Sequence, residues 1–239
     1  MSAASFLAEL AGQGPIRRPV ALVVAHPDDE TIAAGATLAR FLDLTLIHIT
    51  DGAPQDPAVA RAHGFTTREA YAAARAAELT AALAAACARP VRSLAYGIPD
   101  GEVPSALPTL AARLAADLLP MAAVITHPYE GGHSDHDACA EAVQTAVARL
   151  AALTGRAPAR LEFASYYRRG ALLRPGRFWP DRSCPELVLH FAGPAAGRRA
   201  AALACFTSQA GNLRYFPAAT ERYRAAPDYD FSRPPPPAL

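Results

Sequence analysis

The 239-residue chain contains no lysine, so all 23 of its basic residues are arginine. This absence excludes Schiff-base catalysis and the Walker type of phosphate-binding loop, because both require a lysine amine. Its four cysteines are widely spaced and form no Cys-x-x-Cys pair, so the sequence predicts neither a zinc knuckle nor a redox-active dithiol. The alanine- and arginine-rich, lysine-free composition also indicates a bacterium with a GC-rich genome.

Long apolar runs are absent as well. No stretch reaches the ~18 apolar residues that a membrane span needs, and the first residues lack a signal-peptide pattern. The formal net charge of +1 gives no electrostatic basis for binding nucleic acid or an anionic membrane. We therefore expect a cytoplasmic protein whose partner is a small molecule, and a homo-oligomer is compatible with the sequence.

The length and the apolar content of the chain limit the possible number of domains and the size of the core. With 239 residues, 51% of them hydrophobic, the chain can bury a full core in one large α/β domain. The predicted domain spans residues 1–239, with a core at 19–209 and a C-terminal tail at 210–239.

Two polar motifs each follow a short apolar run. Ala25-His26-Pro27-Asp28-Asp29-Glu30 follows residues 20–24, and the motif at 126–137, Thr-His-Pro-Tyr-Glu-Gly-Gly-His-Ser-Asp-His-Asp, follows residues 122–125. Each pattern is typical of a strand, a polar loop and a helix. Open α/β sheets bind ligands at the carboxyl ends of their strands. A strand order of 3-2-1-4-5 would bring the two motifs together.

The whole pattern predicts a Rossmann-like three-layer α/β sandwich with a mostly parallel sheet. Strands are expected at residues 19–25, 44–49, 91–96, 122–126, 161–166 and 186–191. Helices are expected at residues 31–42, 67–88, 104–119, 137–153 and 194–209. A long loop rich in arginine and aromatic residues follows the fifth strand; its Trp179 is interpreted as either a sugar-stacking residue or a core anchor.

Spacing within the motifs indicates a metal site. His26 and Asp29 lie three residues apart, as do His133 and His136, so each pair can face one point. A histidine, a carboxylate and a second histidine are the usual protein ligands of catalytic zinc or non-haem iron. Asp28 is then free to act as a base. The alternative is that Asp28 or Asp29 only caps the following helix, which leaves His26 and the second motif unexplained.

The two motifs in this order resemble the PIG-L/LmbE-like family of metal-dependent N-acetylglucosamine deacetylases. Further landmarks of the resemblance are Thr50-Asp51-Gly52, Arg75-Ala76-Ala77-Glu78-Leu79 and Pro99-Asp100-Gly101, and it covers most of residues 19–232. The chain departs from the family pattern at Ser134, where proline is usual. That change removes no ligand.

The resemblance implies Zn²⁺, with Fe²⁺ as the alternative ion, at the carboxyl ends of the first and fourth strands. The implied metal ligands are His26, Asp29 and His136. Asp28 is the implied general base, His133 the donor that stabilises the oxyanion, and Asp135 the carboxylate that orients His133. The exchanged assignment, with Asp28 as ligand and Asp29 as base, is disfavoured by the family pattern.

Substrate-binding candidates lie on other segments. Arg68, near the start of a predicted helix, is placed to reach a substrate hydroxyl or phosphate. Asp100 is either a turn residue or, by the resemblance, a substrate contact. Arg75 and Glu78 are equally compatible with a solvated helical pair and with a functional role. His127 is interpreted as structural, with a place beside the metal ligands as the alternative.

The expected reaction is removal of the N-acetyl group from an N-acetylglucosamine-type sugar or its conjugate, by metal-activated water with an aspartate base. The alternative is an amidase of the same fold that cleaves another amide on a glycosylated small molecule or natural product. A non-haem iron oxygenase is disfavoured because it has no need of the free carboxylate Asp28. A non-catalytic binding module is disfavoured because every polar residue of the expected site is present.

Overall fold

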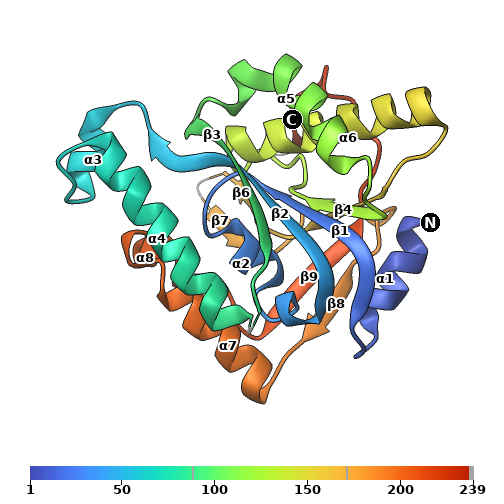
Figure 1. Ribbon diagram of the computed structural model, residues 1–239, viewed down its shortest axis with the longest axis horizontal. Coiled ribbons are helices and arrows are strands. Elements are labelled where there is room, and N and C mark those ends of the chain that lie inside the picture. Colours follow the sequence, from blue (N-terminus) through green and yellow to red (C-terminus); the bar gives the residue numbers. More distant parts are fainter. Residues whose placement is uncertain (88, 171, 237–239) are drawn as a thin grey trace.

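A central β-sheet with helices on both faces forms the body of the molecule (Figure 1). The computed structural model describes residues 1–87, 89–170 and 172–236. The predicted helix end at Ala88 and the last residues of the predicted tail, 237–239, lie outside these ranges.

The described strands and helices have the following bounds. The strands are β1 Ile16–Val24, β2 Phe41–Pro54, β3 Arg92–Asp100, β4 Ala123–Thr126, β5 Ala159–Phe163, β6 Tyr166–Arg169, β7 Leu172–Pro175, β8 Leu187–His190 and β9 Thr220–Ala225. The helices are α1 Ala3–Ala11, α2 Asp29–Ala34, α3 Pro57–Ala62, α4 Arg68–Ala86, α5 Val103–Leu118, α6 Ser134–Thr154, α7 Gly193–Ala204 and α8 Ala210–Leu213, with 3₁₀ turns η1 Leu38–Arg40 and η2 Thr207–Gln209.

The sheet order confirms the predicted arrangement of the first five strands. Among the described residues, the large sheet has the order β3-β2-β1-β4-β5-β9-β8. β1 to β5 pair in parallel, and Leu22 of β1 lies opposite Ile125 of β4. Because parallel neighbours end at the same edge, the motifs that follow β1 and β4 meet there.

Alternation along β1 divides the core between the two faces of the sheet. Val20, Leu22 and Val24 belong to a buried cluster with residues of α1, α2, α4 and α7, whereas Ala21 and Val23 belong to one with residues of α5 and α6. Figure 1 shows α5 and α6 on one side of the sheet and α4 and α7 on the other. The three-layer prediction is confirmed. Among the described residues, no helix has the length and apolar character that a membrane span requires.

The helix predicted at 31–42 is wrong in its extent. α2 ends at Ala34, and β2 already begins at Phe41. At this end Arg199, a buried residue of α7, donates a hydrogen bond to the carbonyl oxygen of Ile32 (2.6 Å), and the N–H of Ala36 donates to Glu221 Oε1 (2.7 Å). A continued helix would pair the Ala36 N–H with the Ile32 carbonyl, whereas each of these groups bonds to a distant side chain.

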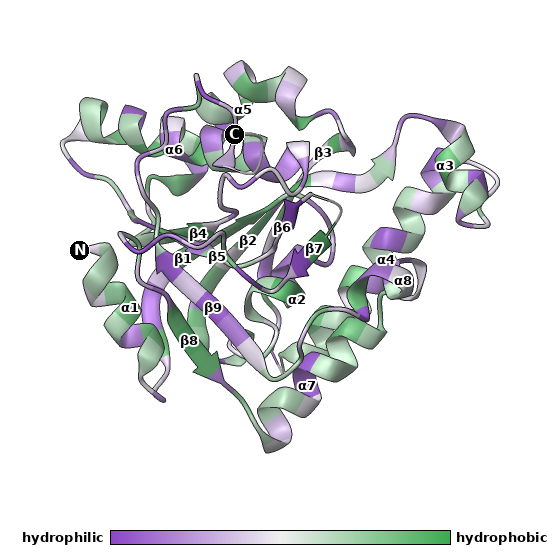
Figure 2. Ribbon diagram, turned by 180° about the vertical axis from the view of Figure 1, so that it is seen from behind, coloured by the Kyte–Doolittle hydropathy of each residue, from purple (hydrophilic) through white to green (hydrophobic). Residues whose placement is uncertain are grey.

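The predicted tail contributes a strand that the sequence analysis did not anticipate. β9 lies between β5 and β8 and is antiparallel to both. Figure 2 shows β9 largely in the colours of hydrophilic residues. Two of its charged side chains, Glu221 and Arg224, are nevertheless buried. The boundary predicted at residue 209 therefore separates β9 from the sheet that it joins.

The segment predicted as a loop after β5 contains a hairpin. β6 and β7 pair in an antiparallel two-stranded sheet in which Arg168 lies opposite Leu173. Trp179, which follows the hairpin in the chain, packs edge-on against Tyr167 of β6, with 5.1 Å between ring centroids.

Candidate functional site

The turn between β1 and α2 has an unusual backbone. Asp28 is the one described non-glycine residue with a positive φ, 141°. Its N–H donates to Glu30 Oε2 (3.0 Å), and the same carboxylate oxygen lies 3.1 Å from His48 Nε2. Backbone strain of this kind persists where surrounding contacts enforce it, and it concentrates at functional sites. The Asp28 side chain makes no capping bond, so the capping interpretation of this residue is wrong.

Three ligand-type atoms converge beside this turn. Asp29 Oδ2 lies 3.3 Å from His26 Nδ1 and 3.4 Å from His136 Nε2, and those two nitrogens are 3.3 Å apart. The three residues are buried. His136 lies in the first turn of α6, which places its side chain at this point. α6 begins at Ser134, three residues earlier than predicted. The structure thus brings together the three residues for which the resemblance implied a metal.

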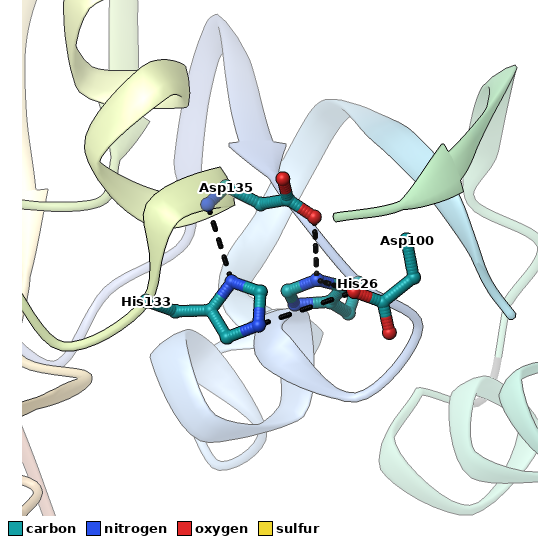
Figure 3. A group of neighbouring side chains, drawn as sticks. All are labelled: His26, Asp100, His133 and Asp135. Carbon is teal, nitrogen blue, oxygen red and sulfur yellow. Dashed lines mark hydrogen bonds and ion pairs between the residues drawn. The ribbon is translucent and has the colours of Figure 1, made fainter. Parts of the chain in front are cut away.

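The other ring nitrogen of His26 is held by carboxylates (Figure 3). His26 Nε2 lies 3.1 Å from both Asp100 Oδ1 and Asp135 Oδ2. Burial opposes a charge on His26, but these carboxylates outweigh it and raise the pKa of the imidazole. Asp135 is itself fixed by the N–H groups of Gly101 (2.7 Å) and Val103 (3.2 Å). Carboxylates in this position fix the orientation and tautomer of metal-binding histidines.

His133 lies at the cavity side of this cluster. Its Nδ1 accepts from the backbone N–H of Asp135 (3.1 Å), whereas the Asp135 carboxylate contacts His26 rather than His133. Burial, together with the nearby His26 and His136, lowers the pKa of His133 to about 4. The neutral ring therefore carries its hydrogen on Nε2, the nitrogen 4.0 Å from Asp100 Oδ1.

Arg75, left undecided by the sequence, is the partner of Asp28. Its Nη1 and Nη2 both lie 3.3 Å from Asp28 Oδ2, and the side chain is 3% exposed. Burial raises the pKa of Asp28 to about 7, against the opposing charge of Arg75. The solvated-pair interpretation is wrong, because Glu78 accepts hydrogen bonds from Ser208 instead (2.7 Å from its N–H). The sequence feature that pointed to a functional role for Arg75 was its place in the Arg75-Ala76-Ala77-Glu78-Leu79 landmark of the family resemblance.

His127 is fully buried behind the ligand cluster. It stacks on His136 with 3.9 Å between ring centroids, and its Nε2 accepts from the N–H of Ala25 (3.0 Å). Burial lowers the pKa of His127 to about 3, so the ring is neutral. The residue thus has structural contacts, as interpreted, and also lies against a candidate ligand.

Gly52 sets the position of Arg75. A Cβ at this glycine (φ +69°) would lie 2.7 Å from Arg75 Nε and 2.9 Å from Pro27 Cδ. We expect Gly52→Ala to destabilise the protein by about 3 kcal/mol, because strain at positive φ adds to a clash with buried atoms. Gly155→Ala is the matched control, since it has φ +68° and no atom within 4 Å, and should cost about 1 kcal/mol. Urea unfolding measures both, and equal losses would contradict the clash.

A cavity of about 300 Å³ opens over these groups. Its polar floor consists of His26, Asp28, Asp29, Asp100, His133 and His136. Arg68 does not line it and instead pairs with Asp51 (2.5 Å), so its substrate contact stays a prediction. Trp179 is also absent from the lining, in keeping with its packing on Tyr167.

Comparison with known proteins places this geometry in context. The sequence profile of a family described as "PIG-L: GlcNAc-PI de-N-acetylase" matches residues 21–147, more than half of the chain. A protein from Bacillus anthracis, described as probable N-acetyl-alpha-D-glucosaminyl L-malate deacetylase 2, is 30% identical over 142 residues. That match covers 56% of this chain and only 61% of the relative's length.

Solved structures share the fold. The zinc inhibited form of teicoplanin deacetylase Orf2 has a TM-score of 0.62 at 14% identity, over 85% of this chain and 97% of that one. GalB, a 4-carboxy-2-hydroxymuconate hydratase from Pseudomonas putida, has a TM-score of 0.60 at 18% identity, over 89% and 98%. At these identities the likeness shows the fold alone, and the two names describe different reactions.

Proposed function

The chain belongs to the PIG-L family, and we propose that it is a metal-dependent hydrolase that removes the N-acetyl group from an N-acetylglucosamine-type sugar or its conjugate. The observation that carries the proposal is the convergence of His26, Asp29 and His136 beside a carboxylate, Asp28, that is not one of the three. The deacetylase described for the Bacillus anthracis relative supports the same reaction class.

The donor set fits a zinc or iron ion. Zinc binds histidine nitrogen and carboxylate oxygen at about 2.0–2.2 Å, which gives about 3.3–3.6 Å between neighbouring ligand atoms of a tetrahedron. The three separations of 3.3, 3.3 and 3.4 Å among His26, Asp29 and His136 agree with that edge length. When bound, the ion supplies Lewis acidity and lowers the pKa of water toward neutrality.

Asp28 is the proposed general base. Asp28 lines the cavity floor next to the proposed ligand Asp29, and its Oδ2 accepts hydrogen bonds from the Arg75 guanidinium. A carboxylate there takes the proton of the attacking water and returns it to the departing amine. Arg75 fixes the direction of the carboxylate and favours its charged form.

His133 is the proposed donor to the oxyanion. Because its Nδ1 is occupied as an acceptor, its Nε2–H is the atom available to the cavity. A donor in this position stabilises the negative charge that develops on the carbonyl oxygen as water adds. The products are acetate and the free amino sugar.

The test combines metal analysis with an amine-release assay on N-acetylglucosaminyl compounds, with and without chelator. We expect about one zinc or iron per chain and amine release that chelator abolishes and metal restores. Since a structural relative is described as a zinc inhibited form, each metal is titrated from below one equivalent to excess. Release of another acyl group in preference to acetyl would favour the amidase alternative. Bound metal without release of any acyl group would contradict the proposal.

A further inference from the structure

The cavity continues outward from its polar floor to a mouth of different character. The mouth is formed by two segments, the hairpin of β6 and β7, which contributes Tyr166, Arg168 and Leu173, and residues 206–216, which hold α8. In both views the hairpin lies beside α2, the helix that carries Asp29 (Figures 1 and 2). A molecule whose amide reaches the floor and which extends along the cavity therefore contacts these mouth segments.

One face of the hairpin points into the cavity. Arg168 and Leu173 are cross-strand partners, and both line the cavity. The next pair, Arg169 and Leu172, lies on the opposite face and is absent from the lining. Successive residues of a strand alternate between faces, so the hairpin has one arginine–leucine pair facing the cavity and a second arginine–leucine pair facing away from it.

The mouth segments carry charge of one sign. Arg168 is the charged residue that they contribute to the lining, and their other lining residues, Tyr166, Leu173, Gln209, Asn212, Leu213, Tyr215 and Phe216, are uncharged. The acidic residues that line the cavity, Asp28, Asp29 and Asp100, all belong to its floor. The charge that the mouth presents to the cavity is therefore positive, and it favours a ligand group of negative charge.

The mouth also exposes large apolar side chains. Leu173 is 39% exposed and Tyr215 is 58% exposed, and both line the cavity. Phe216 and Tyr166 extend this lining inward, with 6.2 Å between their ring centroids. Exposed apolar and aromatic side chains gathered in a cavity typically mark a ligand-binding surface.

We propose that the mouth binds the group attached to the amino sugar, and that this group is an aromatic ring bearing an anion, as in an acidic aryl glycoside. Arg168 pairs with the anion, while Leu173 and Tyr215 enclose the ring. The inference rests on the proposed deacetylation and adds the class of conjugate to it. Arg168 and Leu173 act as specificity-determining residues and have no part in the chemical step.

The test is a two-by-two set of N-acetylglucosaminides, in both anomeric forms, assayed by amine release from the metal-loaded protein. The attached groups are methyl, carboxymethyl, phenyl and 4-carboxyphenyl, which separate charge from ring. We expect the highest kcat/KM for 4-carboxyphenyl. Arg168→Gln should lower the ratio of kcat/KM for 4-carboxyphenyl over phenyl about tenfold, the loss of a charge-assisted contact. Leu173→Ala should lower the ratio of phenyl over methyl about fivefold.

Arg169→Gln and Leu172→Ala are matched controls, because they make the same changes on the face that points away from the cavity. Both ratios should stay within twofold of the unmodified protein. Equal effects of Arg168→Gln and Arg169→Gln would show general electrostatics and overturn the assigned contact. Release that is independent of the attached group would overturn this inference alone. Release from no glycoside would overturn the proposed function together with it.

Discussion

Replacing Asp28 by asparagine is expected to lower kcat for the proposed amine release about 10³-fold and to leave metal binding at the proposed site unchanged. Asparagine has the same shape and still accepts a hydrogen bond from Arg75, but it cannot take a proton from water. Asp28 is not one of the three residues whose ligand atoms converge, so the metal content measured by elemental analysis should not change. Asp29→Ala is the contrasting variant, since it removes one of those atoms and should lose the metal.

Asp117→Asn controls for the chemical change itself. Asp117 is a partly buried carboxylate of α5 that accepts a hydrogen bond from Tyr96 (2.6 Å) and does not line the cavity. Its asparagine variant should turn over at the normal rate. An Asp28→Asn protein that retains near-normal kcat would remove Asp28 from the role of base, whereas one that loses its metal would make Asp28 a ligand.

Replacing Arg224 by methionine destabilises the protein by about 3–5 kcal/mol, because it leaves buried carboxylates without their cation. Arg224 is 3% exposed and lies 2.8 Å from both Glu130 Oε1 and Glu162 Oε2. Its guanidinium also stacks over Phe178, 4.2 Å from the ring centroid. Urea unfolding at fixed pH measures the loss.

The loss should grow with pH. Burial raises the pKa of Glu130 and of Glu162 to about 7 each, against the opposing charge of Arg224. Without Arg224 their folded-state pKa values rise further, so the folded state holds protons that the unfolded state has released. Stability then falls as pH rises from the ordinary carboxyl range through the folded-state pKa. The difference between variant and unmodified protein should therefore be larger at pH 8 than at pH 5.

Arg222→Met provides the comparison on the same strand. Arg222 pairs with Glu186 at 2.8 Å, but both side chains reach solvent, and such surface pairs contribute less than about 1 kcal/mol. A comparable loss in the two variants would show that removal of any arginine from β9 matters, rather than removal of the buried cation. A loss in Arg224→Met that is the same at pH 5 and pH 8 would contradict the electrostatic explanation.

The position of the site was predictable because it depends on two local signals and one general rule. Polar motifs directly after apolar runs mark strand ends, and the parallel order 3-2-1-4-5 places the ends of β1 and β4 side by side. The meeting of the pairs His26/Asp29 and His133/His136 at one edge follows from these, whereas the choice of His136 rather than His133 came from the family resemblance. No distant side chain has to be known to predict it.

Features that depend on distant partners were not predictable in the same way. α2 stops early where Arg199 and Glu221, both more than 160 residues along the chain, bond to the Ile32 carbonyl and the Ala36 N–H. β9 has a polar sequence, which does not indicate an inner strand. It can lie inside the sheet because its charged side chains pair with buried partners, as Arg224 does with Glu162. The Asp135 carboxylate lies against His26 because the backbone N–H groups of Gly101, just after β3, and Val103, at the start of α5, hold it there. Hydrophobic periodicity is a local signal, so it cannot predict contacts between residues that are far apart in the sequence.

The place of β9 in the sheet also affects the order in which the protein matures during synthesis. β8 pairs only with β9 among the described strands, and the loop that leads to His133 is tied to β9 through Glu130 and Arg224. Residues 220–225 leave the ribosome after every other strand of the sheet. Until they emerge, a nascent chain can assemble the five parallel strands but has an unpaired β8 and an untethered loop before His133. Completion of the proposed metal site is therefore expected to follow, rather than guide, the last step of sheet formation.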